Sequence, residues 1–303
     1  VLGYLVIYSV YNPDAWWIIL ANGFLPRPSF IAMAFVLASA MFNYNKLNWK
    51  ISRKEYLFYL FLILCWVSTF VFGVNVDSET WEYVIKVTKL FFFIFFFLRV
   101  VKSEKDYKMV VWTIILCGIW HAYQAHINFS SGRLDSGGGV DFAEGNGIAA
   151  YLSIGVIFLG FQMLRYSLLL QIIFIFAIVL MLDAIILTES RSIFLGLIFA
   201  VPYVFLNIPP GKFKQISIYT FLGIVLFFIL VDTSFMERMG TIGGLNQSIT
   251  MNDSQLINQK VHADRMDFWR ASIDIFRDHP WGIGVKNFYK IVPSYDPLNP
   301  GMD

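Results

Sequence analysis

Long apolar runs separated by short polar loops follow one another along most of this chain. Two of the runs, Tyr56 to Val74 and Ile216 to Asp232, approach the ~20 apolar residues that a helix needs to cross a ~30 Å hydrocarbon core. Of the 303 residues, 57% are hydrophobic and only 15% are charged. A water-soluble domain would not carry so much apolar surface. The sequence therefore predicts an all-α, polytopic integral membrane protein.

Nine apolar segments can be distinguished, and each is predicted to be a transmembrane helix. They cover residues 1–11, 25–42, 56–74, 83–101, 109–128, 147–164, 167–187, 192–208 and 215–232. Residues 1–232 are thus predicted to form a transmembrane helical domain, and residues 233–303 a large loop outside the membrane. Within that loop, residues 240–260 are polar, and we expect them to be partly disordered or to form a mobile lid.

Basic residues are distributed unevenly over the loops between these segments. One set of alternate loops holds eleven, in residues 43–55, 99–108, 165–166 and 209–214, and the other set holds Arg27, Arg133 and Arg191. Loops rich in Lys and Arg stay on the cytoplasmic side. The sequence therefore predicts that the large loop and Arg191 lie on the outer side of the membrane.

The composition also limits the ligands that we expect. The net charge of +2 is too small to indicate a nucleic-acid partner. Cys65 and Cys117 lie in apolar runs, which favours small hydrophobic side chains over a disulfide or a metal pair. The sequence has neither an Asp-x-Asp nor a His-Glu-x-x-His pattern. We therefore expect no metal ion and no cofactor.

The outer loop of residues 129–146 is rich in glycine. A phosphate cradle is one interpretation, but the loop lacks the lysine and the following Ser or Thr of a P-loop. We interpret it as a flexible loop that lines an entrance.

Arg191 lies at the outer junction of two apolar segments, directly after Ser190. Ser190 is a suitable helix N-cap, so the next helix would offer free N–H groups and the positive end of its dipole beside the guanidinium group. Such a corner suits phosphate binding. The alternative is an interfacial arginine that reaches lipid headgroups or pairs with Glu189.

Residues 264–288 form a polar, amphipathic stretch after the apolar segments. Their apolar side chains recur at helical spacing, which predicts a surface helix docked through Met266, Trp269, Ile273 and Phe276. His279-Pro280 ends this helix, and Gly282 and Gly284 then allow a tight turn.

Arg265 opens the amphipathic helix on the same side of the membrane as Arg191. A planar guanidinium group binds phosphate oxygens with two parallel hydrogen bonds and stays charged at any relevant pH. Arg265 is therefore a second candidate for phosphate binding. The alternative is a solvated residue paired with Asp264 or Asp267.

Other polar side chains fall inside the apolar segments, where ionisable groups are costly. Lys86 and Lys89 lie one turn apart, and we favour an intramembrane ion pair with Asp183 over the alternative that both add charge to an anion pocket. His121, Gln124 and Asn128 share one helical face, and we expect them to be satisfied intramembrane polar groups. His126 is off that face.

Several short patterns occur in a characteristic order, with the last two in the large outer loop. They are Thr188-Glu-Ser-Arg191-Ser-Ile-Phe-Leu195, Arg265-x-x-x-Trp269 and Pro280-Trp-Gly-Ile-Gly284-x-x-Asn-Phe288. In these patterns and in its topology the chain resembles the O-antigen ligase/polymerase superfamily. Tyr11-Asn12-Pro13 is similar to the O-glycosylation ligases associated with exosortase systems.

The resemblance implies a multi-helix glycosyltransferase of the bacterial inner membrane with an active site that faces the periplasm. Such an enzyme transfers a glycan from undecaprenyl pyrophosphate, without a metal, to an acceptor hydroxyl on the lipid A core of lipopolysaccharide, a protein or a second glycan. By resemblance, Arg191 and Arg265 bind the pyrophosphate. Ser190, Lys86 and Lys89 are further candidates for substrate binding.

The general base of the family is a histidine that comes after the region matching Pro293 to Asp303. We therefore expect the catalytic residue to lie beyond Asp303, and the chain to be truncated at both ends. A polymerase of the same superfamily is the alternative function. A transporter or scaffold for lipid-linked glycans is less favoured, because internal repeats with Gly/Pro-broken segments are not visible in the sequence.

Overall fold

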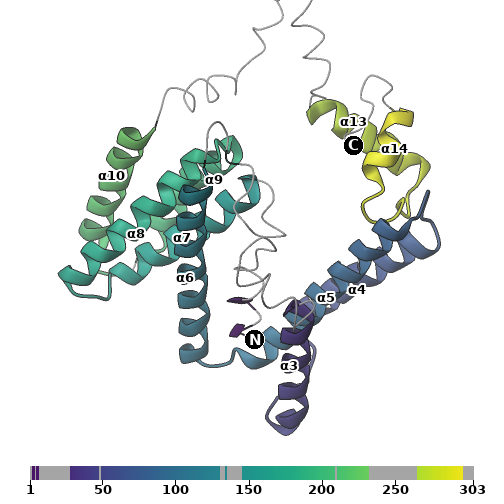
Figure 1. Cartoon of the computed structure of the whole chain (residues 1–303), viewed down its shortest axis with the longest axis horizontal. Helices are drawn as coiled ribbons and strands as arrows, with labels where there is room; N and C mark the ends of the chain where they lie inside the picture. The colour runs from purple at the N-terminus through teal and green to yellow at the C-terminus, as the bar shows by residue number, and fades with distance from the viewer. Residues whose placement is uncertain are drawn as a thin grey trace, which may run out of the picture. The chain divides into compact units, whose positions relative to one another are not determined.

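A computed structural model describes residues 2–3, 5–6, 28–47, 49–129, 134, 145–208, 210–231 and 265–295 (Figure 1). All regular elements in these ranges are helical, which confirms the predicted all-α class. Tyr11-Asn12-Pro13, most of loop 129–146 and residues 240–260 lie outside the described residues. The predicted boundary after residue 232 falls there too and stays a prediction.

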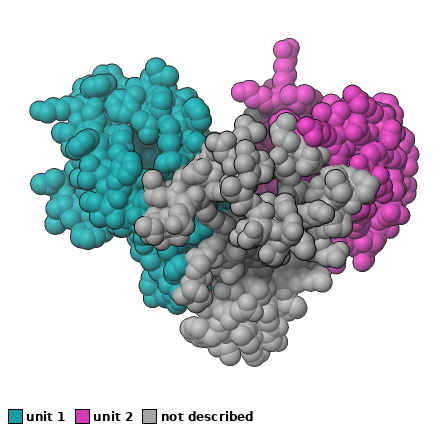
Figure 2. Space-filling view, turned by 90° about the horizontal axis from the view of Figure 1, so that it is seen from above, with its two compact units in different colours: residues 1–42, 101–244 teal, residues 43–100, 245–303 magenta. Residues whose placement is uncertain are grey.

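The chain divides into two compact units, each built from two separate stretches of sequence (Figure 2). Unit 1 comprises residues 1–42 and 101–244, and unit 2 comprises residues 43–100 and 245–303. The helices of unit 1 are α3 (Pro28–Phe42), α6 (Glu104–Asn128), α7 (Gly145–Met163), α8 (Leu168–Leu187), α9 (Arg191–Leu206) and α10 (Phe213–Leu230). Those of unit 2 are η1 (Tyr44–Lys46), α4 (Arg53–Phe70), α5 (Ser78–Val100), α13 (Arg265–Asp278) and α14 (Phe288–Tyr295).

A helix overlies each predicted apolar segment from 25–42 to 215–232. Among the described residues, α6, α7, α8 and α10 are long and apolar enough to span a membrane, so the predicted count of nine is not confirmed. Helices α3 and α9 are shorter, α4 begins with three charged residues, and α5 carries glutamates, lysines and an arginine along its length.

The core of unit 1 lies among α6, α7 and α8, where Ile115, Leu152 and Met181 are fully buried. Gly118 on α6 and Gly155 on α7 both face the sulfur of Met181, and a Cβ atom at either glycine would lie only 3.3 or 3.1 Å from it. These glycines therefore let the three helices pack closely around one long side chain.

In unit 2, α4 and α5 form a helical hairpin. Ser52 and Glu55 make a capping box at the start of α4, which satisfies two backbone N–H groups. The buried Arg99 of α5 donates to Glu55 at 3.0 Å and covers the ring of Phe95, 3.5 Å from its centroid. An ion pair thus joins the start of α4 to the end of α5.

The amphipathic helix predicted after residue 264 is present as α13, but the predicted face does not pack against the described part of the chain. Trp269, Ile273 and Phe276 are 70%, 52% and 65% exposed, and the Met266 side chain is outside the described residues. Instead, Ala271 and Ile275 are buried in a small core with residues of α14 and the intervening turn. The small Ala271 side chain allows a close approach along this second apolar face.

Candidate functional site

The turn after α13, residues 279–287, is bound to the α4–α5 end of its own unit, and we call it the docked turn. The backbone N–H of Gly284 donates to Ser68 Oγ and that of Val285 to Thr69 Oγ1, both at 3.1 Å. The N–H of Val74 donates to the carbonyl oxygen of Ile283, also at 3.1 Å. Residues more than 200 positions apart in sequence are thereby joined.

Two glycines make this docking possible. Gly282 and Gly284 have φ of +92° and +94°, in a region that L side chains rarely adopt. A Cβ atom at Gly282 would overlap Ser68 Oγ, and one at Gly284 would lie 2.9 Å from Asn287 Nδ2. The predicted tight turn at these glycines is confirmed, and its close approach to α4 gives a second reason for glycine.

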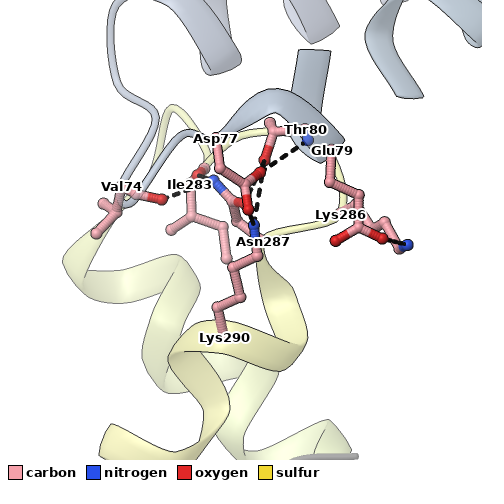
Figure 3. Close-up of polar contacts among 8 residues, drawn as sticks. All are labelled: Val74, Asp77, Glu79, Thr80, Ile283, Lys286, Asn287 and Lys290. Carbon is pink, nitrogen blue, oxygen red and sulfur yellow. Dashed lines mark hydrogen bonds and ion pairs between the residues drawn. The ribbon is translucent and has the colours of Figure 1, made fainter. Parts of the chain in front are cut away.

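Asn287, the last residue of the docked turn, is fully buried. Its side chain contacts residues on both sides of the attachment (Figure 3). Its amide nitrogen donates to the carbonyl oxygens of Val74 at 2.6 Å and Ile283 at 3.0 Å. Its Oδ1 lies 2.9 Å from Thr80 Oγ1, and Asp77 Oδ1 lies 2.8 Å from the same Thr80 oxygen. The Thr80 hydroxyl has one proton, so it donates to one of these two acceptors at a time. The Asn287 side chain thus uses both of its donor hydrogens, while its acceptor shares the Thr80 hydroxyl proton with Asp77.

Two lysines complete the attachment. Lys290 donates to Asp77 at 2.7 Å, and Lys286 donates to Glu79 while lying 4.1 Å from the centroid of the Tyr83 ring. The Lys290 ammonium group, together with the backbone and hydroxyl of Thr80, holds the pKa of Asp77 far below its usual range.

The hydrogen bond to Glu79 raises the pKa of Lys286. Lys286 also has a φ of +64°, unusual for a residue other than glycine. These polar side chains therefore hold the docked turn against the residues between α4 and α5 and against the start of α5.

A second polar site, the α8–α9 corner, comprises residues 188–192 of unit 1. The chain leaves α8 through Thr188, whose hydroxyl donates to the Ile185 carbonyl at 2.6 Å, and through Glu189, which has a φ of +49°. A non-glycine residue in this conformation is strained, and such strain concentrates at functional sites. The corner then turns directly into α9.

Ser190 occupies the N-cap position of α9 as predicted, but its side chain does not cap the helix. The buried Ser190 hydroxyl instead donates to Asn146 Oδ1 at 2.8 Å. Asn146 is the second residue of α7, so the N-termini of α7 and α9 meet at this contact. Both helix dipoles present their positive ends here, beside the first residue of α9, Arg191.

The favoured pairing of Asp183 with Lys86 or Lys89 would join the two units and stays a prediction, whereas within unit 1 Asp183 has a histidine partner. Nε2 of His126 lies 2.6 Å from Asp183 Oδ2, and Nδ1 lies 2.6 Å from the Ala122 carbonyl oxygen. A carbonyl oxygen only accepts, so Nδ1 carries a proton. The pair links α6 to α8 four residues before α8 ends. Sequence reasoning missed it because His126 lies off the face that His121 shares with Gln124.

The remaining candidates are distributed over both units. Lys86 and Lys89 are exposed on α5, and Lys86 lies 5.6 Å from the centroid of the Tyr83 ring. Arg265 is the first residue of α13. The side chains of Arg191 and Arg265 are outside the described residues, and these arginines belong to different units. Their joint binding of pyrophosphate stays a prediction.

Comparisons with known families cover both halves of the chain. Residues 176–303, which include the α8–α9 corner and the docked turn, match the O-Antigen ligase family. Residues 1–142 match a family of unknown function, DUF5935. Searches among curated proteins and solved structures give no match. The chain is a bacterial multi-pass membrane protein, and its residues 176–303 belong to the O-antigen ligase family.

Proposed function

We propose that this protein is a metal-independent glycosyltransferase that transfers a glycan from undecaprenyl pyrophosphate to an acceptor hydroxyl at the periplasmic face of the bacterial inner membrane. Membership of the O-antigen ligase/polymerase superfamily implies ligase or polymerase activity in general. The lipid-linked donor, the sidedness and the absence of a metal are the specific parts of the proposal.

One observation carries the proposal furthest: two helix N-termini meet at the Ser190–Asn146 contact beside Arg191. Helix N-termini bind anions because their first N–H groups have no partner within the helix. The Ser190 side chain does not cap α9, so it does not itself occupy those N–H groups. A pyrophosphate is the dianionic ligand that suits such a corner.

In the proposed reaction, the acceptor hydroxyl attacks the anomeric carbon of the donor sugar and displaces undecaprenyl pyrophosphate with inversion. The hydroxyl proton passes to a base, for which the family resemblance implies a histidine. Negative charge grows on the leaving oxygen, and Arg191 and Arg265 stabilise it in a site of lowered dielectric. Ser190, Lys86 and Lys89 remain candidates for donor binding.

The proposal is tested by reconstituting the purified full-length protein in proteoliposomes with an undecaprenyl-pyrophosphate-linked glycan and candidate acceptors. We expect the glycan to move to an acceptor in the presence of EDTA. Donor binding without transfer to any acceptor would favour a scaffold, and loss of transfer with EDTA would overturn the metal-independent mechanism.

A polymerase of the same superfamily is the alternative function. It would join glycan to glycan and produce a ladder of lengths from single repeat units, whereas a ligase transfers the chain that it receives. Gel analysis of the reconstituted products separates the two.

A further inference from the structure

Helix α13 has a large apolar face besides the one that packs against α14. With ~100° of rotation per residue, Trp269, Ile273 and Phe276 form a stripe well separated from the buried Ala271 and Ile275. All three side chains of the stripe are more than half exposed. An exposed aromatic stripe of this kind marks an interaction surface.

The docked turn fixes the depth at which α13 lies relative to α4. Helix α4 has 18 residues, and its three charged residues all lie in the first turn. The part that follows, residues 56–70, is about 22 Å long and is apolar enough to enter a hydrocarbon core. Most side chains of this part are apolar and many are exposed, as at Leu57 and Ile63, which suits contact with lipid. Ser68 and Thr69, which hold the docked turn, belong to the last turn of α4. α13 immediately precedes the docked turn, so its C-terminal end is held at the level where α4 ends.

The exposed apolar surface is continuous from α4 towards α13. Phe70 and Val71 at the end of α4 are 76% and 63% exposed. The next residue, Phe72, stacks on Trp281 of the docked turn, with ring centroids 6.1 Å apart and planes at 18°. Trp281 is itself 66% exposed, so a lipid layer that surrounds α4 would also meet the docked turn.

We propose that α13 lies in the membrane–water interface on the side where α4 ends, with Trp269, Ile273 and Phe276 inserted among the lipids. Tryptophan is favoured at this level because its ring is apolar while its N–H reaches polar groups. Arg270 and Arg277 on the neighbouring face can reach lipid phosphates while their stems stay apolar. The bilayer surface is thus the partner of this face.

Spin labels on two consecutive residues test the proposal in the full-length protein. The native Cys65 and Cys117 are replaced by alanine, and a nitroxide is attached to Ile273→Cys or, as the matched control, to Asp274→Cys. Asp274 is 53% exposed and pairs with Arg277 on the polar face. The protein is placed in nanodiscs of phosphatidylethanolamine and phosphatidylglycerol, and relaxation by oxygen and by a water-soluble nickel chelate is measured.

We expect the ratio of oxygen to nickel accessibility to be several-fold higher at Ile273 than at Asp274. Equal nickel accessibility at the two sites would show a solvated face and would overturn the proposal. Protection of Ile273 from both reagents would also overturn it, because the face would then be covered by protein, either another part of this chain or a second copy. Quenching of native tryptophan fluorescence by brominated lipids, reduced in Trp269→Gln, provides an independent measurement.

Discussion

Replacing Asn287 with aspartate should release the docked turn although the side chain keeps its size. Asn287 is fully buried and donates to the carbonyl oxygens of Val74 and Ile283. An ionised carboxylate has no hydrogen to donate, so both carbonyls would face a negative oxygen at hydrogen-bond distance. An unsatisfied buried polar group costs about 1–3 kcal/mol, which gives about 3 kcal/mol for the pair.

A change of about 3 kcal/mol shifts the docking equilibrium by about 10²-fold, since 1.36 kcal/mol corresponds to a factor of ten. Hydrogen exchange measured by mass spectrometry in nanodiscs reports this equilibrium. We expect exchange in residues 279–295 to rise by about 10²-fold in Asn287→Asp, while peptides from α7 and α8 exchange at the wild-type rate.

Asn128→Asp is a matched control because it makes the same chemical change at an exposed residue of α6. It should leave exchange in residues 279–295 unaltered. Wild-type exchange in the Asn287→Asp variant would refute the view that the donors of Asn287 hold the turn. An equal rise in both variants would show that added negative charge, not the lost hydrogen bonds, releases it.

Two further predictions concern the same attachment. Gly282→Ala should release the docked turn, because its Cβ would overlap Ser68 Oγ and an L residue at φ +92° is strained. Adding Ser68→Ala to this variant should restore part of the lost exchange protection. The absence of any restoration would argue against the overlap. The Lys290–Asp77 pair should stabilise docking fully at pH values above the ordinary aspartate pKa of about 3.9. This contribution should be lost as pH falls through the lowered pKa of Asp77. Proteolysis of residues 279–295 should therefore increase in acid, and a similar acid response in Asp77→Asn would contradict the assignment.

The helical segments could be predicted because long apolar runs carry a strong local signal. The number of membrane spans could not be confirmed. Helices α4 and α5 carry charged residues, and α3 and α9 are short, so being helical does not by itself make these segments long and apolar enough to cross a bilayer. The glycine turn was also predictable, because Gly282 and Gly284 can adopt the positive φ angles that a tight turn needs.

The docking face of α13 was mispredicted because the helix has two apolar stripes at helical spacing. The larger stripe, with Trp269 and Phe276, carries more apolar area, yet Ala271 and Ile275 pack because a small side chain permits close contact. The acceptors of the docked turn, such as Ser68 and Thr80, had no local signal, since Thr80 and Asn287 are 207 residues apart in sequence. Pairing of His126 with Asp183 was hidden for the same reason.

The most direct test of the proposed function is the rate of glycan transfer by the full-length Arg191→Gln protein in proteoliposomes with an undecaprenyl-pyrophosphate-linked donor. Loss of one group that stabilises developing negative charge typically lowers kcat by on the order of 10²-fold or more, and we predict a fall of that size in Arg191→Gln. Hydrogen exchange in residues 279–295 should be unchanged in this variant. Arg191→Lys should keep partial activity. Wild-type transfer by Arg191→Gln would contradict the assignment of the α8–α9 corner as the pyrophosphate site.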